Sequence, residues 1–192
     1  MNLVYKFTLE DDYPIPEGGI VCNMKDYRYT FWNPQLKLLP NYMNPKSIDL
    51  LMLSLAVYGA DRFFLRKNAV DGWKRKIHIH LPVLDINTMI AKKELMQDTL
   101  DFLSGDEWEL NFRQRDFTSE ENDYRDRIEN GKNTKISAKR ICMFSGGLDS
   151  FIGAIDLLEE VEDHIIFVSH YGGGKGVREY QQLLQGELMK EY

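Results

Sequence analysis

The chain has 192 residues, of which 43% are hydrophobic and 28% are charged. This composition is that of a globular protein, and the length accommodates one large domain or two small ones. The formal net charge of −6 argues against a nucleic-acid-binding surface, because such surfaces are usually basic. Cys22 and Cys142 lie far apart, which excludes a disulfide framework or a zinc knuckle within these residues.

No segment of the sequence is expected to enter or cross a membrane. Residues 1–6 lack the basic region and apolar run of a signal peptide. The longest apolar stretch, residues 50–60, is interrupted by Ser54 and is too short to span a bilayer. We therefore expect a cytoplasmic protein without a membrane partner.

Residues 1–116 are predicted to form an α+β domain. Strands are expected at residues 3–9, 77–81 and 108–112, where apolar and polar side chains alternate. Residues 20–32 are rich in aromatic and β-branched residues and are predicted to be a strand or one arm of a hairpin. Nothing in this part of the sequence points to a particular function.

Two helices are expected between these strands. The first begins at Asn44-Pro45, with asparagine as the N-cap and proline as the first helical residue, and it ends near Gly59. Asp49 is expected in the first turn, where the helix dipole favours an acidic side chain. The second helix is predicted to be capped by Asn87 and to end at Ser104-Gly105.

Residues 117–139 are predicted to be a charged linker or exposed loop between two domains. Acidic and basic residues crowd this segment, large aliphatic residues are nearly absent, and Asn130-Gly131 is a turn signal. The second domain would then begin at residue 140.

Residues 140–192 alternate strand, glycine turn and helix, as a parallel α/β fold does. The apolar runs 141–144 and 165–168 are expected to be buried parallel strands. Helices are expected after each of them, at residues 148–158 and 177–192. The connection between the two strands would be a right-handed crossover.

The turn after the first of these strands reads Ser145-Gly146-Gly147-Leu148-Asp149-Ser150. Unpaired N–H groups and the dipole at a helix start favour an anion, and glycine lets a phosphate approach the backbone. The two serines add hydroxyl donors, and Asp149 is a candidate to hold Mg²⁺ or to orient a ligand. The alternative is an ordinary glycine turn in which a serine caps the helix.

This motif resembles that of the PP-loop ATP pyrophosphatases, over about residues 140–192. Within that family the tract Val168-Ser169-His170-Tyr171-Gly172 is similar to the Tyr-Gly turn of the 7-cyano-7-deazaguanine synthases, the QueC type. The resemblance implies the start of a doubly wound parallel sheet of the adenine nucleotide alpha hydrolase type. A preceding domain of this size is similar to that of QatC-type proteins, which are the QueC-like component of the Qat anti-phage defence system.

The resemblance also implies a reaction and its ligands. Such enzymes bind ATP and Mg²⁺, adenylate a carboxyl or carbonyl oxygen of a substrate, and release pyrophosphate. A nitrogen nucleophile then displaces the adenylated oxygen. Residues 145–150 would hold pyrophosphate, and Asp149 would have the catalytic role. The acceptor would be a small molecule or a protein, and a partner protein of a defence complex is expected.

The sequence departs from the QueC pattern after its Tyr-Gly turn. The family continues with Gln-Arg-His, whereas this chain has Gly172–Gly176 with Lys175 inside it. Lys175 and His170 remain candidate cofactor-binding residues. The alternatives are an exposed loop lysine and a structural or exposed histidine.

The sequence up to Tyr192 also has fewer strands than a PP-loop domain, and it has no cysteine-rich zinc site like that of QueC. We therefore expect a piece of a longer protein, or a domain that another chain completes. In that second case the chain would be a binding or assembly module. His78 and His80 share one strand face, but without a third ligand they predict no metal site.

Overall fold

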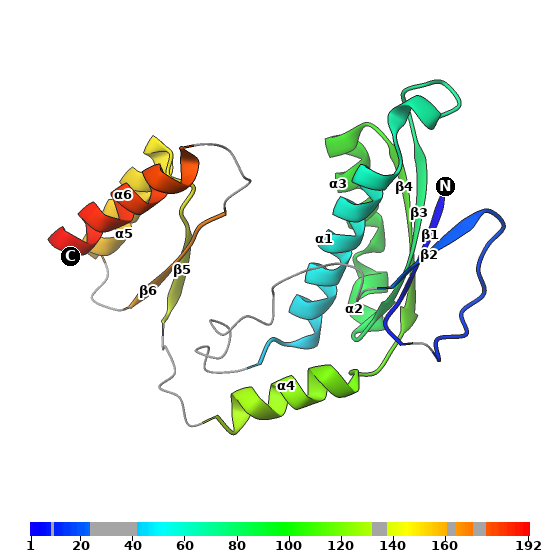
Figure 1. Cartoon of the computed structure of the whole chain (residues 1–192), viewed down its shortest axis with the longest axis horizontal. Coiled ribbons are helices and arrows are strands. Elements are labelled where there is room, and N and C mark those ends of the chain that lie inside the picture. Colours follow the sequence, from blue (N-terminus) through cyan, green and yellow to red (C-terminus); the bar gives the residue numbers. More distant parts are fainter. Residues whose placement is uncertain (9, 24–41, 132–137, 161–163, 171–175) are drawn as a thin grey trace. The chain divides into compact units, whose positions relative to one another are not determined.

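The computed structural model describes residues 1–8, 10–23, 42–131, 138–160, 164–170 and 176–192 (Figure 1). The chain divides into two compact units, Met1–Asn133 and Thr134–Tyr192. This division falls inside the segment that the sequence predicts to be a linker. Within the described residues, no helix is long and apolar enough to cross a membrane.

The first unit is built on a four-stranded sheet whose neighbouring strands all run parallel. The strands are β1 (Asn2–Lys6), β2 (Gly19–Asn23), β3 (Lys76–Val83) and β4 (Glu107–Gln114), in the order β2-β1-β3-β4. A parallel sheet with helical crossovers is an α/β fold, so the predicted α+β class is wrong for this unit. Of the predicted strand or hairpin arm at residues 20–32, the structure shows β2, which pairs in parallel with β1 and so makes no hairpin with that strand. Residues 24–32 of that prediction lie outside the described residues.

Helices cover one face of this sheet (Figure 1). They are α1 (Pro45–Phe63), α2 (Ile86–Ala91) and α3 (Lys93–Ser104), and a short 3-10 helix, η3 (Arg66–Asn68), follows α1. The residues of β3 that face them are fully buried: Ile77, Ile79, Leu81 and Val83. The alternate residues, among them His78 and His80, lie on the opposite face.

The predicted start of α1 is confirmed, and its predicted end is wrong. The Asn44 side chain accepts a hydrogen bond from the Ser47 N–H at 2.9 Å, and Pro45 is the first helical residue. The helix then continues through Gly59 to Phe63. A glycine inside a helix costs only about 1 kcal/mol, and the additional turn buries Ala60 completely.

Asp49 does not serve as an acidic residue of the first helical turn, because it lies beyond that turn. Its side chain is buried and accepts hydrogen bonds from the N–H groups of Leu84 and Asp85, at 2.8 and 2.7 Å. Burial raises the pKa of the Asp49 carboxyl more than these two hydrogen bonds lower it. The residue ties α1 to the end of β3.

The single helix predicted after Asn87 is two helices. Asp85 caps α2, accepting a hydrogen bond from the Thr88 N–H at 3.0 Å, so Asn87 lies inside the helix. The backbone leaves helical geometry at Lys92, with φ −109° and ψ 2°, and α3 starts after it. The predicted end at Ser104-Gly105 is confirmed, since Gly105 has φ +72°.

The predicted linker is wrong for residues 119–129, which form the helix α4 (Ser119–Glu129) of the first unit. Thr118 and Glu121 make a reciprocal capping box at its start. Arg115 donates two hydrogen bonds to the Glu121 carboxylate, at 2.7 and 2.9 Å, and Ile128 is buried. These contacts compensate for the scarcity of aliphatic residues.

A buried ion-pair network holds the loops that precede β3 and β4. The Asp106 side chain has no exposed surface and accepts hydrogen bonds from Arg75 and Arg66. Arg75, only 2% exposed, also donates to Asp61 and to the carbonyl of Phe64 at the end of α1. Burial alone would raise the pKa of Asp106, but Arg75 and Arg66 together hold it below its ordinary value.

We predict that Asp106→Asn lowers the free energy of unfolding by about 3 kcal/mol at pH 7, because it leaves Arg75 buried without its main counter-charge. Since the folded-state pKa of Asp106 is depressed, its contribution is present above the unfolded pKa of about 4 and is lost as the pH falls through the folded pKa. Urea unfolding at several pH values measures both effects. Asp98→Asn, the same change on the exposed side of α3, is the control, and an equal loss in both variants would contradict the role of Asp106.

The second unit has the strand and helix order that the sequence predicts. Its strands β5 (Arg140–Met143) and β6 (Ile165–Val168) pair in parallel, and its helices are α5 (Leu148–Glu160) and α6 (Val177–Glu191). Both helices lie on one side of the two strands (Figure 1). Phe144 and Phe167 meet edge to face in the small core, with ring centroids 5.9 Å apart. This is a parallel α/β arrangement of two strands.

Candidate functional site

The motif Ser145–Ser150 lies at the carboxyl end of β5 and runs into the first turn of α5. Because β5 and β6 are parallel, the residues after β6, Ser169 and His170, come to the same edge of the sheet. Phe144 continues the pairing by donating its N–H to the Val168 carbonyl at 2.8 Å. In open α/β sheets, ligands bind at the carboxyl edge of the strands.

The loop closes on itself through its two serines. The Ser145 hydroxyl donates to the Ser150 hydroxyl at 3.0 Å, which in turn donates to the Gly147 carbonyl at 2.9 Å. The Gly147 N–H approaches the Ser145 Oγ at 3.3 Å. Hydroxyl groups rotate freely, so both can turn toward a ligand without any movement of the backbone.

The start of α5 supplies backbone donors. The Phe151 N–H donates to the Gly147 carbonyl at 3.0 Å, which is the first hydrogen bond of the helix. The N–H groups of residues 148–150 precede it and have no partner within the helix. Asp149 is exposed in this first turn and Leu148 is 72% exposed. The turn therefore presents donors and one carboxylate to solvent, although an acidic residue here also stabilises the helix by itself.

Gly146 must be a glycine for two reasons. Its φ of +84° lies in the left-handed region, which costs other residues about 1–2 kcal/mol. A Cβ at this position would also lie 2.8 Å from the Cγ of Gln181. At Gly147, by contrast, a Cβ would meet only the Ser145 Oγ, at 3.6 Å.

Gln181 of α6 is a site residue that the sequence analysis does not identify. Its side chain is buried, and its amide nitrogen donates to the Ser145 carbonyl at 2.9 Å and to the His170 carbonyl at 3.0 Å. The available signal is its spacing, because Gln181 lies on the same helix face as Leu184 and Leu188, which pack in the core. A glutamine in an apolar stripe needs polar partners inside the protein.

The two remaining predicted site residues are His170 and Lys175. His170 follows β6 and is exposed. Its backbone carbonyl accepts a hydrogen bond from the Gln181 side-chain amide. Lys175 lies outside the described residues. The structure thus brings together residues 145–150 and the backbone of His170.

A small hollow of about 380 Å³ opens between the motif and the first turn of α6. Gly176, with φ +88°, precedes that turn. Tyr180 is 63% exposed and adds an aromatic surface. The hollow is lined by Ser145, Gly146, Gly147, Gly176, Val177 and Tyr180.

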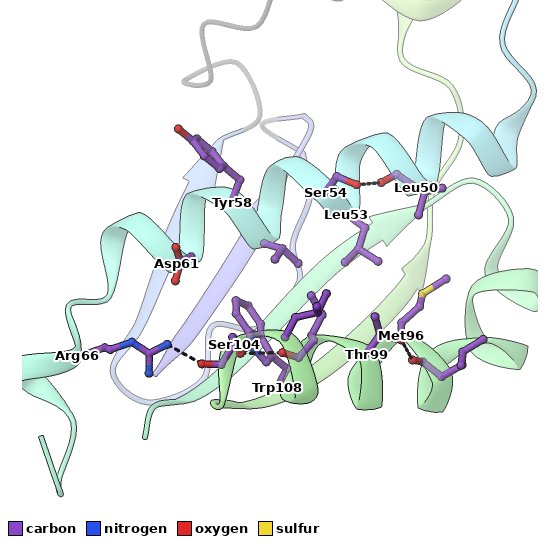
Figure 2. Close-up of a pocket in the computed structure, with 14 residues that line it drawn as sticks. Leu50, Leu53, Ser54, Tyr58, Asp61, Arg66, Met96, Thr99, Ser104 and Trp108 are labelled. Carbon is purple, nitrogen blue, oxygen red and sulfur yellow. Dashed lines mark hydrogen bonds between the residues drawn. The ribbon is translucent and has the colours of Figure 1, made fainter. Parts of the chain in front are cut away.

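The first unit contains a larger groove, of about 780 Å³, between α1 and α3. Figure 2 shows Leu53 and Met96 on its walls and Trp108 at its floor. The indole N–H donates to the Ser104 hydroxyl at 2.8 Å, and Arg66 donates to the Ser104 carbonyl at 2.7 Å. Its lining is mostly apolar and these polar groups are paired with one another, so we assign no reaction to it.

A second, polar hollow of the first unit lies beyond the ends of β1 and β4 and has a volume of about 470 Å³. Arg113 pairs there with Asp11, and Arg115 pairs with Glu121. Their guanidinium groups stack on the rings of Tyr13 and Phe7, at 4.2 and 4.0 Å. Since both arginines have carboxylate partners, the hollow shows no excess positive charge for an anion.

His78 and His80 are engaged with protein groups rather than with each other. His78 Nδ1 lies 2.8 Å from a Glu109 carboxylate oxygen, and His80 Nδ1 lies 3.0 Å from the Tyr13 hydroxyl. Burial, followed by the neighbouring His78, lowers the pKa of His80. Within the described ranges, no group of three or more His, Cys, Asp or Glu side chains is placed to hold a metal ion.

Comparison with known proteins finds no matching family model, no matching curated protein and no matching solved structure. Any assignment of function to this chain therefore depends on its own residues and their geometry.

We predict that Gly146→Ala destabilises the second unit by at least about 1–2 kcal/mol, the cost of a left-handed alanine, and that the contact with Gln181 adds to this loss. Denaturant unfolding, followed by a probe in the second unit, measures the change. Gly153→Ala is the control, since a Cβ at that position in α5 meets nothing within 4 Å and alanine favours a helix. Equal stability of the two variants would contradict the strain at Gly146.

Proposed function

We propose that residues 145–150 bind the pyrophosphate part of ATP together with Mg²⁺, and that the chain is the nucleotide-binding part of a QueC-like adenylating enzyme. One observation carries this proposal. The six-residue motif that resembles a PP-loop lies at the carboxyl end of a parallel strand, where it forms a loop with a left-handed glycine and begins a helix.

The residues present suit an anionic, phosphate-bearing ligand. Leu148, Asp149 and Ser150 carry backbone N–H groups without helical partners, and the positive end of the α5 dipole lies beside them. Gly147 leaves its Cβ side open, so a phosphate can approach the backbone there. Asp149 is the exposed carboxylate of the turn and would hold Mg²⁺.

In the proposed reaction this chain's residues orient the triphosphate and stabilise charge. Bound Mg²⁺ would neutralise negative charge on the phosphate oxygens as pyrophosphate leaves. The backbone donors of residues 146–150 and the hydroxyls of Ser145 and Ser150 would hold the leaving group. The serines act as donors, because the loop pairs them with each other and with a carbonyl rather than with a base. Neither serine is a nucleophile in this proposal.

The acceptor of the adenylyl group is proposed from the resemblance alone. It would offer a carboxyl or carbonyl oxygen, which a nitrogen nucleophile later attacks. A partner protein of an anti-phage defence complex belongs to the same inference. A nucleic acid is not proposed, since the net charge of −6 would repel it.

The second candidate function is a binding or assembly module, and an uncovered sheet face favours it. Ile141 and Met143 of β5 are each 67% exposed, and Val168 of β6 is 40% exposed. These residues share the face opposite α5 and α6, because Ile141 pairs with Ile166 and Met143 with Val168. Parallel sheets are normally covered on both faces, so this face is suited to contact more protein.

We predict that calorimetric titration shows Mg²⁺-dependent binding of ATP to the 192-residue chain. Asp149→Ala should weaken this binding about tenfold or more, equivalent to about 1.4 kcal/mol, because a carboxylate ligand of the metal is lost. Removal of Mg²⁺ with EDTA should bring the wild-type chain to the affinity of the variant.

Asp156→Ala removes an exposed carboxylate farther along α5 and is the matched control. It should bind ATP and Mg²⁺ like the wild type. If Asp149→Ala and Asp156→Ala bind equally well, Asp149 does not hold the metal. If the wild-type chain binds no ATP at all, this chain forms no nucleotide site by itself, and the assembly module becomes the better account.

A further inference from the structure

We infer that Gln181 is a positioning residue for the loop of residues 145–150. Its side chain orients the Ser145–Gly146 peptide group, the first of that loop. This inference rests on the proposed function for its link to ATP, but its geometric part stands without it. The observation is that Gln181, a residue only 5% exposed, donates through its side-chain amide to two carbonyls on two different loops, those of Ser145 and His170.

The direction of the Ser145 carbonyl decides where the next N–H points. The Ser145–Gly146 peptide is planar and trans, as are all peptide bonds of the described residues. In a trans peptide the carbonyl oxygen and the N–H point in opposite directions. Since the carbonyl oxygen points to Gln181 at 2.9 Å, the Gly146 N–H is directed away from Gln181. Within the described part of the chain this N–H donates to no acceptor.

The left-handed Gly146 is part of the same arrangement. With φ +84°, it turns the chain so closely over Gln181 that a Cβ would lie 2.8 Å from the Cγ of that side chain. The glutamine thus contacts the loop in two ways. Its methylene groups pack against Gly146, and its amide donates to the Ser145 carbonyl. Any side chain at position 146 would displace one or the other.

The second hydrogen bond extends this support to the neighbouring strand. The His170 carbonyl lies 3.0 Å from the same amide nitrogen, so α6 holds the ends of β5 and β6 at a fixed separation. Gln185, one turn later on α6, adds a weaker contact by donating to the Ser169 hydroxyl at 3.3 Å. A side chain without N–H donors at position 181 would leave both carbonyls without this partly buried hydrogen bond.

The test compares Gln181→Met with Gln182→Met in the full chain. Methionine keeps the length and flexibility of glutamine but has no N–H group. Gln182 is the exposed neighbour on the same helix, so the control makes the same substitution one position away. Two signals are measured, namely the affinity for ATP with Mg²⁺ by calorimetry and the amide resonances of Gly146 and Gly147 by NMR.

In Gln181→Met we expect about tenfold weaker nucleotide binding, together with shifted or broadened signals of Gly146 and Gly147. Gln182→Met should match the wild type in both. The inference is overturned if Gln181→Met lowers only the melting temperature and leaves the affinity and both amide signals unchanged, since this would be a purely structural role. If the wild type binds no nucleotide, the proposed function fails, and the amide signals alone still decide the positioning.

A measurement on the unmutated chain covers the case in which Gln181→Met does not fold. Both hydrogens of the Gln181 side-chain amide should be protected from exchange with solvent, because each has a carbonyl acceptor. The Gln182 amide on the exposed face should exchange fast. Equal exchange of the two side-chain amides would overturn the inference.

Discussion

Parallel pairing of β5 with β6 brings the loops that follow both strands to one edge of the second sheet. Parallel strands require a crossover, and here the crossover helix α5 begins directly after the Gly146-Gly147 turn. The N–H groups at the start of that helix therefore lie at the same edge of the sheet as the residues that follow β6. The left-handed Gly146, the hydrogen bond between the two serines and the buried Gln181 all fix the conformation of the loop at this edge.

Local signals predict much of the fold where they do not depend on distant residues. Asn44-Pro45 starts α1 as expected, Gly105 ends α3, and the second unit has its predicted order of strands and helices. These features depend on caps, proline and apolar periodicity within a few residues. The predicted α+β class of the first unit was wrong, because alternating apolar residues do not distinguish parallel from antiparallel pairing.

Sequence reasoning failed where a polar side chain is paired with another group of the folded protein. The linker prediction overlooked α4, although Thr118 and Glu121 form a capping box, because its stability also depends on the pairing of Glu121 with Arg115. The Asp49 carboxylate accepts hydrogen bonds from the backbone N–H groups of residues 84 and 85, which lie 35 and 36 residues farther along the chain. Gln181 supports Ser145, which precedes it by 36 residues. The motif itself was identified from sequence, but the residue that holds it was not.

The central claim is that the loop at residues 145–150 holds the phosphates of a nucleotide. A crystal structure of the chain with Mg²⁺ and an ATP analogue that carries a methylene group between the α- and β-phosphorus tests it most directly. The account predicts phosphate oxygens against the backbone N–H groups of Gly146 to Ser150, with the metal beside Asp149 and the Ser145 carbonyl still bound to Gln181. A nucleotide bound elsewhere on the chain, with this loop still closed through Ser145 and Ser150, would contradict it.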